Sequence, residues 1–187
     1  MNISEVRLTN YYHHFLLALS KFEVMNKIVL YIFFCLSGNF AIAQTKGSLI
    51  TARQVNLPSF SITKVPDSSR FEKSNLQKNK AVMIMVFSPD CDHCQHKVKE
   101  IQANIKLFKN IQILMVSNLG YDYINRFYKE FNMAKYPGIT MGMDYRYTIG
   151  NFFIIGSVPA IFLYNKSGKF VKAFDRDIPV QKIPAAL

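Results

Sequence analysis

The order of apolar patterns between residues 81 and 131 most constrains the fold of this chain. Residues 81–87 (AVMIMVF) form a continuous apolar run between polar stretches, which predicts a central strand buried on both faces. Four apolar residues then recur at helical spacing and predict one face of an amphipathic helix: Val98, Ile101, Ile105 and Phe108.

The alternation of strand and helix patterns continues after residue 108. Residues 111–116 (IQILMV) predict a second buried strand, and Ile124, Phe127 and Phe131 mark the apolar face of a second helix. Strand, helix, strand and helix in this order predict a parallel α/β core. Two further candidate strands are SFSIT, around Phe60 and Ile62, and ITMGM, residues 139–143.

The last part of the chain predicts an antiparallel hairpin. Residues 160–164 (AIFLY) and 169–174 (KFVKAF) flank the turn NKSG, in which Asn165 and Gly168 are turn-forming residues. The tail DRDIPVQKIPAAL after Phe174 is a candidate for a truncated final helix.

The N-terminal region differs from the rest in composition. From Met25, a candidate start, the sequence has a basic Lys27, the apolar run Ile28–Leu36 and a segment ending in Ala-Ile-Ala. This is the pattern of a secretory signal, with cleavage expected between Ala43 and Gln44, and the apolar run is too short to span a bilayer. An uncleaved N-terminal anchor is the alternative. We therefore expect a leader over residues 1–43 with its signal at 25–43, a linker over 44–57, and one domain over 58–187.

Charge and cysteine content narrow the function classes. The chain carries a net charge of +11, and residues 1–43 account for +1 of it through three bases and two acids (Arg7, Lys21, Lys27, Glu5, Glu23). The remaining bases are scattered without a run of five, which favours a solvated basic surface over nucleic-acid binding. Three cysteines are too few for a disulfide scaffold, and Cys35 lies in the leader. Only Cys91 and Cys94 belong to the domain, where an oxidising compartment would let them cycle or stay oxidised.

The segment FSPDCDHCQH, residues 87–96, places this cysteine pair directly after the first predicted strand. A helix N-terminus favours the thiolate, so Cys91 is the predicted attacking thiol. Cys94 follows in the first helical turn, more buried, where it can resolve a mixed disulfide. Protonated His93 would stabilise the Cys91 thiolate, whereas Asp92 and Asp90 would oppose it.

Two segments carry a resemblance to a known family. SFSIT…SNLQKNKAVMIMVFSPDCDHC resembles the opening of the redoxin branch of the thioredoxin-like superfamily, which includes exported TlpA-like and AhpC/TSA-related proteins. GSVPAIFLYNKSGKFVKAF is similar to that family's closing segment, and the likeness covers residues 58 to 180. It implies an α/β, thioredoxin-like fold with a central mixed β-sheet flanked by helices. The implied function is thiol–disulfide oxidoreductase activity in an exported bacterial protein, periplasmic or in the cell envelope.

The resemblance also implies roles for individual residues. Cys91 and Cys94 would form the redox-active disulfide, and Val158 with a cis-bonded Pro159 would bind the substrate chain by strand addition. No dissociable cofactor is implied. The expected partners are protein thiols or disulfides and a second redox protein, with no nucleic acid; peripheral membrane association and the direction of electron flow stay open. The chain departs from the family at Ser88-Pro89-Asp90, where many members have a tryptophan, and at Met85, where thioredoxin has a buried acid.

Other interpretations of the cysteine motif compete with exchange. Cys91, His93, Cys94 and His96 are ligand types for zinc or copper, which would make a metal-binding module. The adjacent His93 and Cys94 do not readily point at one ion, so we expect no metal site.

A peroxidase motif is absent, and a structural disulfide closing so short a loop would contribute only about 2 kcal/mol. A non-catalytic interaction module on the same fold is the last alternative. Phe152 and Phe153 are candidates to line a substrate groove near the proline loop.

Overall fold

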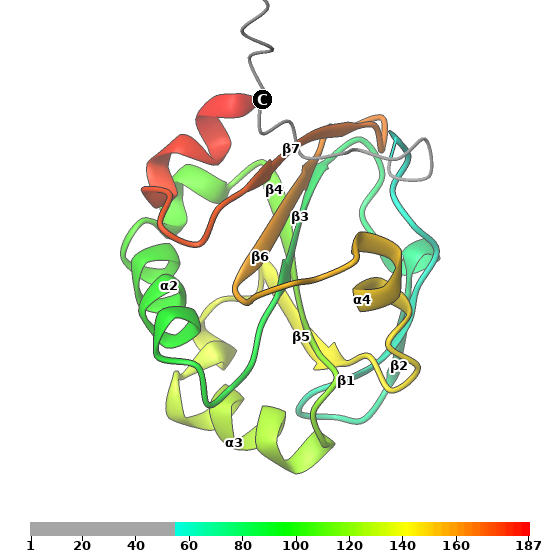
Figure 1. Cartoon of the computed structure of the whole chain (residues 1–187), viewed down its shortest axis with the longest axis vertical. Coiled ribbons are helices and arrows are strands. Elements are labelled where there is room, and N and C mark those ends of the chain that lie inside the picture. Colours follow the sequence, from blue (N-terminus) through cyan, green and yellow to red (C-terminus); the bar gives the residue numbers. More distant parts are fainter. Residues whose placement is uncertain (1–54) are drawn as a thin grey trace, which may run out of the picture. The chain divides into compact units, whose positions relative to one another are not determined.

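The computed structural model describes residues 55–187, so the predicted leader with its signal segment and Cys35, and most of the predicted linker, lie outside the described residues. Within this range the chain forms a seven-stranded sheet with helices on both faces (Figure 1). The strands are β1 (Ser61–Lys64), β2 (Arg70–Glu72), β3 (Ala81–Val86), β4 (Ile111–Ser117), β5 (Ile139–Met143), β6 (Ala160–Tyr164) and β7 (Phe170–Phe174).

The strand order is β2-β1-β5-β4-β3-β6-β7. Strands β3, β4 and β5 run parallel, whereas β6 pairs antiparallel with β3, and β7 antiparallel with β6. On the other side β1 is antiparallel to both β5 and β2. The expected mixed α/β sheet is confirmed. Its central strand β3 is buried along its whole length, as its unbroken apolar run predicts.

In the described part of the chain, three α-helices cover the sheet: α2 (Asp92–Ala103), α3 (Tyr121–Glu130) and α4 (Thr148–Phe153). Helices α2 and α3 lie on one face and α4 on the other (Figure 1). Short 3-10 turns complete the structure at η2 (Lys73–Asn75), η3 (Ile105–Phe108), η4 (Met133–Lys135), η5 (Val180–Lys182) and η6 (Pro184–Ala186). The two faces therefore have separate apolar cores, one beneath each helical layer.

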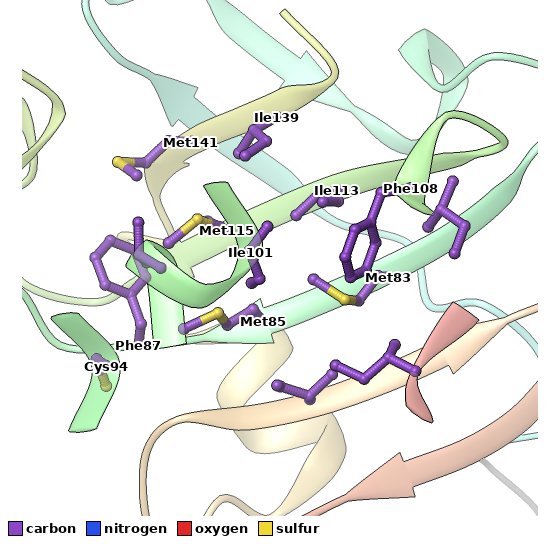
Figure 2. Close-up of a cluster of buried hydrophobic side chains, with 14 of the residues drawn as sticks. Met83, Met85, Phe87, Cys94, Ile101, Phe108, Ile113, Met115, Ile139 and Met141 are labelled. Carbon is purple, nitrogen blue, oxygen red and sulfur yellow. The ribbon is translucent and has the colours of Figure 1, made fainter. Parts of the chain in front are cut away.

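Methionines make up much of the core beneath α2. Met85 on β3 is the register partner of Met115 on β4, which in turn is the partner of Met141 on β5. All three side chains are buried. Figure 2 shows them on the side of the sheet that faces Ile101 of α2, together with Cys94. Methionine is unbranched and fills irregular space, so these three side chains contribute to core packing.

Helix boundaries differ from the predictions because local capping contacts end each helix before its apolar spacing does. The first helix ends at Ala103 instead of continuing to Phe108, because the side chain of Asn104 bonds back to the Glu100 carbonyl and the chain continues as η3. Phe108 is nevertheless buried, since a 3-10 turn brings it to the same core. Phe131 is likewise outside α3 and forms its C-terminal cap.

Two elements were absent from the predicted set. Strand β2 has only three residues and forms through its antiparallel pairing with β1. Helix α4 begins where Asp144 accepts hydrogen bonds from the backbone nitrogens of Thr148 (3.0 Å) and Ile149 (2.7 Å). The N-cap residue is Tyr147, which forms no side-chain cap bond, so the Asp144 carboxylate satisfies the first backbone N–H groups of a helix whose sequence, TIGNFF, has no recognisable helical pattern.

The predicted hairpin of β6 and β7 is confirmed. The side chain of Asn165 accepts hydrogen bonds from the backbone nitrogens of Ser167 and Lys169, both at 3.0 Å. Gly168 has φ of +71°, a conformation that favours glycine. Asn56 pairs with Lys169, and Leu57 is buried, so the packed domain begins slightly before residue 58.

The C-terminal tail forms η5 and η6 rather than one helix. Val180 and Ile183 are buried in the core beneath α2. The predicted final helix is therefore present only as two short 3-10 turns, because Pro184 has no backbone N–H with which an α-helix could continue from η5. The tail closes the end of the apolar core.

Candidate active site

The cysteine pair lies where β3 ends and α2 begins. The Cys91 nitrogen donates to the Ser88 carbonyl at 3.2 Å, which closes the turn between the two elements. Cys91 is the N-cap of α2, with φ of −93° and ψ of 114°, and its Sγ accepts the backbone N–H of Cys94 at 3.4 Å. The predicted position at a helix N-terminus is confirmed. The unpaired N–H groups there can stabilise a negative charge on the sulfur.

The two sulfurs differ in their environment. Cys91 is partly exposed, whereas Cys94 is 0% exposed and packs in the core beneath α2. Burial raises the pKa of the Cys94 thiol to about 12, and the Cys91 side chain acts in the same direction. Both cysteines are free thiols, so the structure corresponds to the dithiol form, and the Cys91–Cys94 disulfide stays a prediction. In this form Cys94 keeps its proton at neutral pH.

The surroundings of Cys94 are apolar. Met85 and Phe87 belong to the same core cluster as Cys94. Among residues 55–187 the one buried carboxylate is that of Asp144, whose oxygens accept the hydrogen bonds that begin α4. Met85 occupies the position where the resembled family suggests a buried acid. This side chain contributes to packing and supplies no proton-transfer group.

The proline loop lies against the attacking sulfur. The peptide bond between Val158 and Pro159 is cis, as the resemblance implies. The Cys91 Sγ lies 3.7 Å from the Val158 carbonyl oxygen, close enough for a weak S–H···O hydrogen bond. These residues are 67 positions apart in the chain, and tertiary packing alone brings them together.

A groove of about 730 Å³ opens beside this loop. One wall is formed by residues 154–157 and Pro159, and the other is Asp175–Pro179, which follows β7. Phe153 and Phe162 belong to its lining, whereas Phe152 is not among the lining residues; a role of Phe153 in substrate binding stays a prediction. The groove is open and combines apolar residues with the charged side chains of Asp175, Arg176 and Asp177.

The remaining predicted residues lie at the surface of the site. Asp92 and His93 are exposed in the first turn of α2, and neither forms a described hydrogen bond or ion pair with a cysteine. An acid in the first turn is favoured by the helix dipole, so Asp92 also has a structural reason to be there. His96 pairs with Glu100 at 3.7 Å. Within residues 55–187 no three His, Cys, Asp or Glu side chains are grouped so that they could hold a metal ion.

Sequence reasoning missed the second wall of the groove and its anchor, Lys97. This lysine lies on the buried face of α2, and its Nζ donates to the Ile178 carbonyl at 2.7 Å. Its spacing of three residues from Cys94 and one from Val98 could have placed it on the apolar face, where a charge is unusual.

Comparisons with known proteins agree with this architecture. No protein-family model matches the chain, and no curated protein matches it. Solved structures do match. A candidate thioredoxin from Neisseria meningitidis is 21% identical over 70% of this chain and 88% of its own, with a TM-score of 0.55. A candidate protein disulfide isomerase from Bacteroides thetaiotaomicron is 17% identical over 73% and 87%, with a TM-score of 0.59.

A secreted disulfide oxidoreductase from Mycobacterium tuberculosis, described as homologous to E. coli DsbE, is 15% identical. The match covers 73% of this chain and all of that one, with a TM-score of 0.56. The chain has a thioredoxin-like fold. At these identities the likeness establishes the thioredoxin-like fold and leaves the chemistry to the site itself.

Proposed function

We propose that this protein is a thiol–disulfide oxidoreductase that exchanges disulfides with protein substrates through Cys91 and Cys94. The observation that supports it best is the pairing of a half-exposed sulfur at the N-terminus of α2 with a fully buried second thiol one turn further on. This division between an accessible attacking thiol and a protected resolving thiol is what sequential exchange requires.

The exchange runs in two balanced steps. In the reducing direction the Cys91 thiolate attacks one sulfur of a client disulfide. That S–S bond breaks, and the other client sulfur leaves as a thiolate that takes up a proton. Cys94 then gives up its proton and attacks Cys91 Sγ, and the mixed disulfide breaks to release the second client thiol. Two electrons pass to the client and Cys91–Cys94 becomes a disulfide; the oxidising direction is the reverse.

The loop beside the sulfur supplies a docking surface for the client. In the proposal, the backbone of Val158 pairs with an extended client segment, and Pro159 shapes the entrance of the groove. Because the Val158 carbonyl contacts Cys91, a client bound at Val158 would hold its disulfide within reach of the attacking sulfur. His93 and Asp92 would adjust the charge near the thiolate in opposite directions.

The partners follow from the chemistry. The dithiol needs no dissociable cofactor, and a second redox protein must supply or remove its electrons. The clients are protein thiols or disulfides, with no nucleic acid. The expected signal at residues 25–43 and the likeness to a secreted oxidoreductase support an exported protein, periplasmic or in the cell envelope. None of the described helices is long and apolar enough to span a membrane.

The reduction potential of the Cys91–Cys94 pair tests the proposal. The purified chain is equilibrated with glutathione buffers of stepped potential, and the thiols are counted by alkylation and intact mass. A reversible two-electron couple is expected. A value near −270 mV, roughly that of thioredoxin, would indicate a reductant, and one near −120 mV, roughly that of DsbA, an oxidant. If the pair never cycles, or reacts only after a metal is stripped, the exchange function is wrong and the non-catalytic or metal-binding module replaces it.

A further inference from the structure

Helix α2 carries a lysine where its pattern requires an apolar residue. The side chain of Lys97 is only 4% exposed and lies on the same buried face as Cys94, Val98 and Ile101. Burying an ammonium group is unfavourable unless it is paired and hydrogen-bonded. A buried lysine at this position therefore needs a specific structural reason.

The partners of Lys97 give that reason. Its Nζ lies 2.5 Å from Glu100 Oε2 on the same helix, a pair that an exposed lysine could form equally well. The second bond, 2.7 Å to the carbonyl oxygen of Ile178, crosses 81 residues of sequence. That second bond joins α2 to the chain beyond β7, and it is the contact that burial of the lysine makes possible.

The segment held in this way is a wall of the groove. Asp175–Pro179 lines the groove together with Ser157 and Pro159 of the proline loop. Val158, which lies between those two residues in the chain, contacts the Cys91 sulfur through its carbonyl oxygen. The other hydrogen bonds of Asp175–Pro179 are local, as between the Ile178 nitrogen and the Asp175 carbonyl at 3.1 Å. Among the residues that the structure describes, Lys97 supplies the only hydrogen bond from a distant element to this segment.

We propose that Lys97 is a positioning residue for exchange with protein clients. It fastens Asp175–Pro179 to the helix that bears the cysteines, so the groove keeps its width when an extended client segment binds beside Val158. This inference rests on the proposed exchange function. Lys97 contacts neither sulfur, so it acts on client binding and leaves the reactivity of the thiols unchanged.

The test separates client binding from thiol reactivity. Lys97→Met keeps an unbranched apolar stem of similar length and removes the bond to Ile178. The full chain and the variant are compared on insulin, whose disulfides lie in a polypeptide, and on the small disulfide DTNB, which needs no groove. We expect the KM for insulin to rise about five- to tenfold, the loss expected for one hydrogen bond, with kcat and the DTNB rate within about twofold. Lys99→Met, an exposed lysine on the same helix, is the matched control and should change neither.

The outcomes are distinct. An unchanged insulin KM in Lys97→Met, or an equal loss with insulin and DTNB, overturns the positioning role. If the unaltered chain reacts with DTNB but does not reduce insulin, the proposed function itself fails, and this inference falls with it.

A second measurement does not depend on the folding of the Lys97 variant. A Cys94→Ser chain is trapped as a mixed disulfide with a cysteine-containing peptide, and amide hydrogen exchange is compared with that of the free Cys94→Ser chain. Slower exchange of Arg176, Asp177 and Ile178 in the trapped form is expected. Unchanged exchange there would show that the segment does not border the bound client, which overturns the inference.

Discussion

The backbone nitrogen of Cys94 lies 3.4 Å from the sulfur of Cys91, so the resolving residue donates a hydrogen bond to the attacking one. The same contact caps α2 and points a backbone N–H at the sulfur that must become negative. Folding of the helix and activation of the thiol therefore depend on one local geometry.

Substitution of each cysteine should separate the two steps. With insulin, Cys94→Ser should accumulate a covalent adduct through Cys91, because no thiol remains to resolve it, whereas Cys91→Ser should form none. Turnover should fall to the uncatalysed rate in both. Non-reducing gels and intact mass detect the adduct. An adduct of equal yield in Cys91→Ser would reverse the assigned roles.

Alkaline pH should destabilise the protein through Cys94. Burial raises the pKa of this thiol from its usual 9.0 to about 12 in the folded chain. Above pH 9 the unfolded chain loses this proton while the folded chain keeps it, so stability is fully present below pH 9 and is lost as pH rises toward 12. Burial also raises the pKa of Tyr164, with the same sign.

The urea midpoint measured from pH 7 to 11 checks this dependence. Cys94→Ala lacks the thiol but keeps Tyr164, so its midpoint should fall less steeply above pH 9 than that of the unaltered chain. Parallel slopes in the two proteins would contradict the assignment to Cys94.

Met85 should contribute to the stability of the core and not to the exchange reaction. It is 0% exposed between β4 and β6, so Met85→Ala should lower the free energy of unfolding by about 2–5 kcal/mol. Met85→Leu conserves volume and should lower it by less than about 1.5 kcal/mol, with the DTNB rate unchanged. Urea unfolding and DTNB kinetics measure the two effects. A large loss of reactivity in the stable Met85→Leu chain would assign the sulfur of Met85 a chemical role.

Gly142 should be required where β5 meets β1. A Cβ there would lie 2.6 Å from the Thr63 carbonyl oxygen, which belongs to the backbone of the neighbouring strand. Gly142→Ala should therefore destabilise the chain by about 1–3 kcal/mol, as overpacked sites do. Gly138→Ala is the control, since a Cβ at that position meets nothing within 4 Å. Equal unfolding free energies for the two variants would show that β1 can move away without loss.

Much of the architecture could be predicted from local pattern. The apolar run of β3 and the helical spacing after Cys91 depend on near neighbours in the chain, and so does the NKSG turn, where Asn165 and Gly168 form their own contacts. The placement of Cys91 at a helix start also follows from these patterns. Prediction failed for β2 and α4 because their sequences carry no recognisable pattern: β2 has only three residues, and α4 begins at hydrogen bonds to the Asp144 side chain.

The sequence alone determined the parallel strand–helix core, the closing hairpin and the position of the cysteine pair. Only the tertiary structure decided that Val158 contacts the Cys91 sulfur and that Lys97 reaches Ile178. Periodicity and turn chemistry act over a few residues and can be recognised along the chain. Contacts across 67 and 81 residues depend on strand register and on which side chains the packed core excludes from water, and these emerge only when the whole sheet is assembled.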